Sequence, residues 1–238
     1  MVGPVGRRST GKGNKGSRRM PLYQLRKGKT EKTVLFIHVP KTGGTAIETY
    51  FRAIGFAGYF DPPTYMPVRP YLKVPPTHYD YGVLKRLYNL DALYSFAVVR
   101  HPVRRMVSEY RWALEKSTAS EKLSKMDFGQ YLRFMFEQFK RDENLASGHF
   151  KPQVRFVGEK VSKIFKYEAG LENIIKHVMK DVGFMIDGQV RLPTVNNTSP
   201  RKVVPTEGDI ALIREAFAED FTAFGYTDDM ESATSPTA

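Results

Sequence analysis

The chain has 238 residues, of which 41% are hydrophobic, and this suits one domain with a sizeable core or at most two small ones. It has 37 basic and 25 acidic residues, a formal net charge of +12, and no cysteine. The composition argues against collagen-like, coiled-coil and wholly disordered chains, and the absence of cysteine excludes disulfides, cysteine-ligated zinc and a thiol nucleophile.

The positive charge is concentrated at the start of the chain. Residues 1–32 hold ten basic residues and one acid, Glu31, whereas the rest of the chain carries a net charge of only +3. The first 30 residues are rich in Gly, Arg, Lys and Ser, and they lack the apolar surface that would offset the entropy lost on ordering. We therefore predict a disordered basic arm over residues 1–32 and no specific nucleic-acid surface on the folded part.

Targeting signals are sparse in this sequence. It contains neither the apolar run of a secretory signal nor that of a membrane span, so we expect no transmembrane segment and a cytoplasmic location. The Arg-rich, acid-poor arm also resembles an organellar transit peptide, which leaves organelle targeting as the alternative.

The residues after the arm alternate between strand and helix patterns. Residues 33–39 are a β-branched and aromatic run that predicts a buried strand, and residues 45–52 predict a helix. A second such unit follows, with a strand at residues 93–99 and a helix over residues 102–116.

The remaining elements continue the same alternation. Apolar spacing and capping signals predict helices at residues 128–139, 171–179 and 206–224 and a short strand at residues 161–166. This order predicts an α/β domain over residues 33–226, with a P-loop-like three-layer fold in which helices flank a central parallel sheet. The polar residues 227–238 are predicted to form a flexible tail.

The turn after the first strand has the sequence Pro40-Lys41-Thr42-Gly43-Gly44-Thr45. Glycines let successive backbone N–H groups point at one anion, and the helix that follows directs its positive end to the same place. The pattern predicts a phosphate-binding loop, the alternative being a glycine turn with a surface lysine. An ATP-hydrolysing loop fits poorly, because the lysine of that motif follows the glycines whereas Lys41 precedes them.

A second set of candidate anion ligands follows the second strand. Arg100 lies where that strand ends, and the carboxyl ends of parallel strands form the ligand crevice of open α/β sheets. Ser108 falls on the second turn of the next helix, away from its apolar stripe. An arginine and a hydroxyl placed in this way suit a second phosphate, although a structural arginine is an equally good interpretation of the segment alone.

Together the two segments resemble the two cofactor-binding motifs of sulfotransferases that use 3′-phosphoadenylyl sulfate (PAPS). The closer resemblance is to the carbohydrate group that includes the heparan sulfate 2-O-sulfotransferases. In that family a Pro-Lys-Thr loop holds the 5′-phosphosulfate, which the resemblance carries onto Lys41, Thr42, Gly43, Gly44 and Thr45. An Arg and a Ser eight positions apart grip the 3′-phosphate, which implies Arg100 and Ser108.

Weaker similarities continue downstream. His149-Phe150-Lys151-Pro152-Gln153 is similar to a His-x-x-Pro-Gln element of the family, and Tyr167-Glu168 resembles its Tyr-Glu strand end. The resemblance therefore implies a PAPS-dependent enzyme acting on a hydroxyl acceptor, possibly a saccharide. A metal need not take part, because the sulfuryl group carries less charge than a phosphoryl group.

The proposed chemistry needs a cation for the leaving group and a base for the acceptor. Lys41 can neutralise the departing 5′-phosphate oxygen, and a histidine with an ordinary pKa of about 6.5 is the natural base. Of the five histidines, the resemblance favours His78, because related 2-O-sulfotransferases place their base between the two motifs. His149 is the second choice, and His38, His101 and His177 lie within predicted elements or turns. A solvent-exposed loop residue is the alternative interpretation of His78.

Two further function classes stay open from the sequence. A nucleotide-dependent P-loop kinase could use the same loop, although the order of its residues counts against this. A basic polyanion-binding protein could use the fold to carry the arm, and in that case the arm would supply the affinity and its salt dependence.

Overall fold

The sheet organises the part of the chain that the computed structural model describes, which is residues 21–27, 30–59, 74–115, 123, 125–184, 190–192 and 203–228. Among these residues, five strands form one sheet in the order β3-β1-β2-β4-β5. Their bounds are β1 Leu22–Lys27, β2 Thr30–Ile37, β3 Ala57–Tyr59, β4 Tyr94–Val99 and β5 Lys163–Lys166.

The centre of the sheet is parallel, as predicted. β4 pairs in parallel with β2 on one side and with β5 on the other. The opposite edge differs, because β1 pairs antiparallel with β2 and β3 pairs antiparallel with β1. Only two residues separate β1 from β2, and so short a connection joins only antiparallel neighbours. The sheet is therefore mixed rather than wholly parallel.

The prediction of a disordered arm over residues 1–32 was wrong for its last part. Residues 22–27 form β1, and Tyr23 is completely buried, with its ring 5.2 Å from that of Phe51. β2 begins at Thr30, so Glu31 and Lys32 also belong to the sheet. A composition average misses this strand because basic residues surround it. Its Tyr23 is buried by residues that lie farther along the chain, such as Phe51. Residues 1–20 lie outside the described part.

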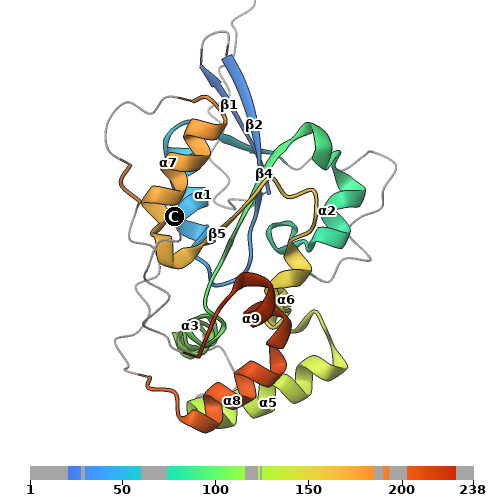
Figure 1. The fold of residues 1–238 in the computed structure, drawn as a ribbon, viewed down its shortest axis with the longest axis vertical. Coiled ribbons are helices and arrows are strands. Elements are labelled where there is room, and N and C mark those ends of the chain that lie inside the picture. Colours follow the sequence, from blue (N-terminus) through green and yellow to red (C-terminus); the bar gives the residue numbers. More distant parts are fainter. Residues whose placement is uncertain are drawn as a thin grey trace, which may run out of the picture.

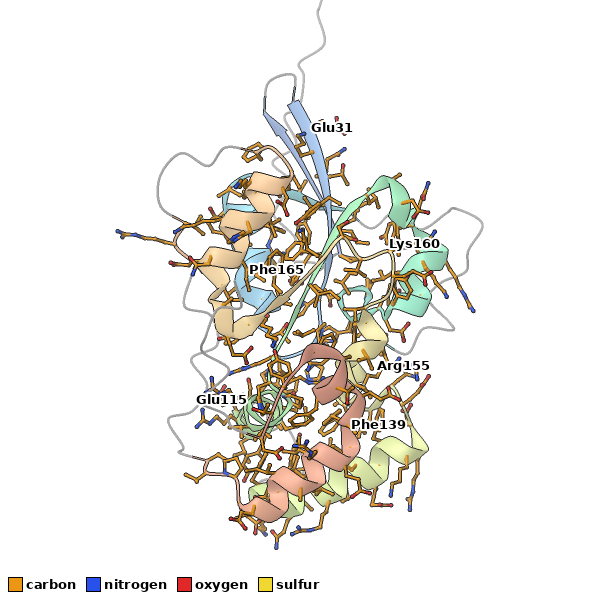
Figure 2. The ribbon with its side chains drawn as sticks, in the orientation of Figure 1. Glu31, Glu115, Phe139, Arg155, Lys160 and Phe165 are labelled. Atoms are coloured by element: carbon orange, nitrogen blue, oxygen red, sulfur yellow. The ribbon has the colours of Figure 1, made fainter. Side chains whose placement is uncertain are left out.

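Helices cover both faces of the sheet, which confirms the three-layer prediction. α1 (Gly44–Ala53) and α7 (Leu171–Asp181) pack on one face, and α2 (Tyr81–Leu87) packs on the other (Figure 1). Alternate residues of β2 serve the two faces, as the period of a strand requires, with Phe36 toward α1 and Leu35 toward α2. Phe165 of β5 lies between the sheet and α7, 6.2 Å from Phe96 and 6.3 Å from the His177 ring (Figure 2).

A group of helices lies beyond the carboxyl ends of the parallel strands (Figure 1). We call these the lower helices, and they are α3 Pro102–Glu115, α5 Phe128–Arg141, α8 Glu207–Ala216 and α9 Ala218–Phe224. They share a hydrophobic core of their own, separate from the two cores that flank the sheet. This arrangement places one body of packed side chains directly beneath the strand ends where a ligand is expected.

The C-terminal helix pattern contains a break that apolar spacing does not predict. The capping box opens α8 as expected, with the Thr206 hydroxyl accepting from the Asp209 amide. At Phe217 the backbone leaves the helical conformation, with φ −125° and ψ 30°, and α9 starts in a new direction. Of the tail predicted over residues 227–238, the structure describes Thr227, whose carbonyl accepts a hydrogen bond from His101 Nε2 at 2.8 Å, and Asp228, while residues 229–238 lie outside the described part.

Candidate active site

A cavity of about 620 Å³ lies at the carboxyl ends of β2 and β4, between the sheet and α3. Its wall includes every residue named as a ligand or base from the motifs except Thr42, namely Lys41, Gly43, Gly44, Thr45, His78, Arg100 and Ser108. These residues come from separate segments of the chain, so the fold brings the two predicted motifs together.

The loop after β2 is shaped by backbone conformations that few residues adopt. Lys41 has φ 70° and Gly43 has φ 83°, both in the left-handed region. A side chain at Gly44 would overlap the His38 ring, so this position needs glycine for space. Left-handed Lys41 carries a strain of about 1 kcal/mol, of the kind that concentrates at functional sites.

Thr42 has a structural part in this loop rather than a wall position. Its side chain is completely buried, and its hydroxyl donates to the Val39 carbonyl at 2.9 Å. The hydroxyl ties the turn to the end of β2, and the predicted contact of Thr42 with the donor stays a prediction.

Arg100 is held at both its backbone and its side chain. Gln153, in the short 3₁₀ helix η3 (Gln153–Phe156), accepts from the Arg100 amide and donates to the Arg100 carbonyl, each at 2.8 Å. The guanidinium lies 4.3 Å from the centre of the Tyr167 ring, and its Nη1 donates to the Lys41 carbonyl at 3.2 Å. The Nε of Arg100 is buried and has no hydrogen-bond partner within the described residues, so the fork can accept an anion.

Three of the five histidines line the cavity and contact one another in a row. The His78 ring lies 5.2 Å from that of His38 and 5.0 Å from that of His149. His38 is bound at Nδ1 by Glu48 at 2.8 Å, and its Nε2 packs against Gly44. His101 and His177 do not line the cavity.

The hydrogen bonds of His78 and His149 define their neutral tautomers. His78 Nδ1 lies 2.9 Å from the Ser147 carbonyl, which only accepts, so the proton resides on Nδ1 and the lone pair on Nε2. His149 Nδ1 lies 2.7 Å from Glu109 Oε2, which favours the same tautomer. Ser147 and its neighbour Ala146 have φ 59° and 49°, and this left-handed turn presents the Ser147 carbonyl to His78.

A family model described as "Sulfotransferase family" matches residues 28–227, which is most of the chain. The chain belongs to the sulfotransferase family. No curated protein and no solved structure matches it. The family assigns transfer of a sulfuryl group to a hydroxyl-bearing acceptor, and the resemblance to its carbohydrate-type members is consistent with this match.

The sulfotransferase cavity also contains residues that the motifs did not identify. Arg104, Arg111 and Trp112 of α3 line it, as do Ser147 and Tyr167. The Lys41 ammonium lies 4.8 Å from the centre of the Trp112 ring. The helical positions of Arg104 and Arg111 relative to Ser108 were a usable signal, since residues three and four apart share one helix face.

Electrostatics in this sulfotransferase site centre on Lys41. Burial and the neighbouring Arg100 lower the pKa of its ammonium, Glu109 raises it, and the result is a pKa of about 8.

The described part of the enzyme holds no group of three or more His, Asp or Glu side chains arranged to bind a metal. None of the helices described is both long and apolar enough to cross a bilayer.

Proposed function

We propose that this sulfotransferase moves the sulfuryl group of PAPS to the hydroxyl of a saccharide acceptor. The observation that carries the proposal is that one cavity joins the Lys41 loop and the Arg100–Ser108 pair. A nucleotide with one phosphate on each side of its ribose needs two such anion sites. Four basic side chains in the described wall, Lys41, Arg100, Arg104 and Arg111, suit the charge of such a donor.

The loop after β2 and the segment from Arg100 into α3 would bind different phosphates of the donor. Backbone amides of residues 43–45 and the Lys41 ammonium would hold the 5′-phosphosulfate at the start of α1. Arg100, with its unpartnered buried Nε, and Ser108 would hold the 3′-phosphate. Gly43 and Gly44 let the loop pack against Leu171 and the His38 ring, which a side chain at either position would overlap.

His78 is the base in this proposal. Its Nε2 takes the proton of the acceptor hydroxyl while the acceptor oxygen forms a bond to sulfur. The bond between sulfur and the 5′-phosphate oxygen breaks, and its electron pair stays on that oxygen. Lys41 neutralises the charge that develops there, so positioning and electrostatics supply most of the catalysis.

His149 is the second candidate for the base, because it lines the same cavity in the same tautomer. Replacing His78 with Asn should abolish transfer and leave nucleotide binding intact. Loss of transfer in His149→Asn with full activity in His78→Asn would instead identify His149 as the base.

The experiment that tests the donor site is calorimetric titration with 3′-phosphoadenosine 5′-phosphate (PAP), the expected product. We expect saturable binding by the wild-type chain and binding about 30-fold weaker or more by Arg100→Ala, since a charged hydrogen bond to phosphate contributes about 2 kcal/mol. Arg155→Ala is the matched control, because Arg155 is an exposed arginine outside the cavity (Figure 2). Absence of PAP binding by the wild-type chain would refute the proposal, and a magnesium-dependent ATPase would favour a kinase.

A further inference from the structure

Glu109 is a buried carboxylate that belongs to neither ligand motif. It lies on α3 between Ser108 and Tyr110, with only 1% of its surface exposed. Its Oε2 accepts from His149 Nδ1 at 2.7 Å. Isolated buried carboxylates are strongly unfavourable, so the fold retains Glu109 against a considerable desolvation penalty.

Neighbouring groups keep Glu109 ionised. Burial alone would raise the pKa of the Glu109 carboxyl, but His149, Lys41 and Arg105 outweigh it and hold that pKa below its usual range. The Nη2 of Arg105 donates to the carbonyls of His149 and Lys151 at 2.8 and 2.7 Å, and its Nη1 lies 3.7 Å from Asp220. Tyr131 of α5 is also affected, because burial and then the charge of Glu109 raise the pKa of its phenol.

Lys41 and His149, the two ionisable wall residues on which Glu109 acts, both line the cavity. The Trp112 ring lies between them, 4.8 Å from the Lys41 ammonium and 5.0 Å from the His149 ring. Lys41, Trp112 and His149 therefore form one continuous stretch of wall, and Glu109 is the buried anion that acts on both of its ionisable members.

We propose that Glu109 is a positioning residue for sulfuryl transfer, because its Oε2 holds His149 in the Nδ1–H tautomer at 2.7 Å and its buried charge acts on the wall formed by Lys41, Trp112 and His149. The inference rests on the proposed function for the role of Lys41 at the leaving group. The protonation of Lys41 can nevertheless be measured without any donor.

The charge of Glu109 matters because Lys41 is close to losing its proton. Burial and Arg100 lower the pKa of Lys41, while Glu109 and, to a smaller extent, Glu115 raise it, and the result is a pKa of about 8. Glu115 is exposed at the end of α3, where water screens its charge. Removal of the Glu109 charge should therefore lower the pKa of Lys41 further, toward neutral pH.

Glu109→Gln separates the effect of the Glu109 charge on Lys41 from the hydrogen bond of Glu109 to His149. The glutamine keeps an oxygen that can accept from His149 Nδ1, but it carries no charge. The matched control is Glu48→Gln, which neutralises the other buried carboxylate paired with a cavity histidine, His38, at 2.8 Å. Glu48 is not among the groups that shift the pKa of Lys41.

Trp112 is the only tryptophan in the chain, so its fluorescence reports on this wall alone. We expect a fluorescence change near pH 8 in the wild-type chain, which Lys41→Met should remove. In Glu109→Gln this midpoint should fall by about one pH unit, the usual effect of a close opposite charge, whereas in Glu48→Gln it should not move. An unchanged midpoint in Glu109→Gln would overturn the inference.

The pH dependence of PAP affinity gives a second measurement, and we expect it to shift to lower pH as the Trp112 titration does. An ammonium with a lower pKa is lost at lower pH, so the alkaline decline in PAP affinity should also move to lower pH in Glu109→Gln. A purely structural role would lower affinity at every pH equally. If PAP fails to bind at all, the proposed function fails, while the Trp112 titration still decides the role of Glu109.

A stability cycle covers the case in which Glu109→Gln folds but is too unstable for the pH titration. Glu109→Gln/Lys41→Met removes both charges, so part of the stability lost in Glu109→Gln should return in urea unfolding. Absence of any recovery would show that the two charges are not coupled and would contradict the inference.

Discussion

Gly44 and His38 lie so close together that the His38 ring fits only because Gly44 has no side chain. The atoms that a methyl group on Gly44 would meet first all belong to the His38 ring. His38 cannot move away easily, because Glu48 binds its Nδ1 and the ring stacks on Phe36 at 5.6 Å. The start of α1, where the 5′-phosphosulfate is proposed to bind, is therefore adjusted to the position of this ring.

Gly44→Ala should destabilise the chain by about 1–3 kcal/mol, the usual effect of overpacking. The cost should be smaller when His38→Ala is already present, because the space is then free, and urea unfolding of the four forms gives the coupling energy. Gly208→Ala is the control, since a methyl group there comes no closer than 3.8 Å to another group. Strict additivity of Gly44→Ala and His38→Ala would exclude the steric explanation.

The sequence predicts some residues of this site and not others, for reasons of distance along the chain. Arg100 directly follows β4, and Lys41 lies in the turn that follows β2, so their places at the strand ends follow from local pattern. Glu109 is different, because a charged residue inside a helix is expected to face water unless its partner is known. That partner, His149, is 40 positions away, and only the packing of the loop before η3 against α3 brings the two together.

At the scale of elements, Asp220 connects α9 to the Arg100 site. Its two carboxylate oxygens accept from the amides of Gln153 and Val154, both at 2.9 Å, and thereby hold the start of η3. Gln153 in turn binds the Arg100 backbone on both sides. Asp220 thus fixes the geometry of Arg100, the proposed phosphate ligand at the end of β4.

Asp220→Ala should be strongly destabilising, by about 3–5 kcal/mol, because it leaves buried amides and the Arg105 guanidinium, 3.7 Å away, without their partner. PAP affinity should fall as well, since Gln153 loses its anchor. Thermal unfolding and calorimetry check both effects, with the exposed neighbour Glu219→Ala as the control. A stable Asp220→Ala variant with wild-type PAP affinity would refute this link.

Elements were predictable where their pattern is local and strong. Helices α3, α5 and α7 lie within two residues of their predicted bounds, because apolar spacing and caps are encoded in the helices themselves. β1 and the break at Phe217 were not predictable in this way. β1 depends on pairing with two other strands, and Phe217 packs 5.6 Å from Phe136 of a different helix.

At the scale of the whole molecule, the basic arm and the sheet overlap. β1 occupies the position between β3 and β2, so removing it would separate β3 from the rest of the sheet. The basic charge of residues 1–20 is a separate matter, because these residues precede β1.

We expect deletion of residues 1–20 to leave thermal stability and PAP binding unchanged, whereas deletion of residues 1–30 should destabilise the chain. The second deletion uncovers the backbone groups of β2 and β3 that now pair with β1, and it opens the space that Tyr23 fills. Loss of PAP binding together with residues 1–20 would favour the polyanion-binding alternative, as would a steep salt dependence confined to the arm.

The cavity between the sheet and the lower helices has a consequence for cooperativity. Its wall draws on residues from His38 to Pro205, so a nucleotide bound there touches bodies with separate hydrophobic cores. Such a ligand stabilises the folded state, in which the sheet and the lower helices are packed together, by about 2.7 kcal/mol at a concentration of one hundred times its Kd. Occupancy of the site then becomes part of the folding equilibrium, and the ligand determines how far the sheet and the lower helices unfold as one unit.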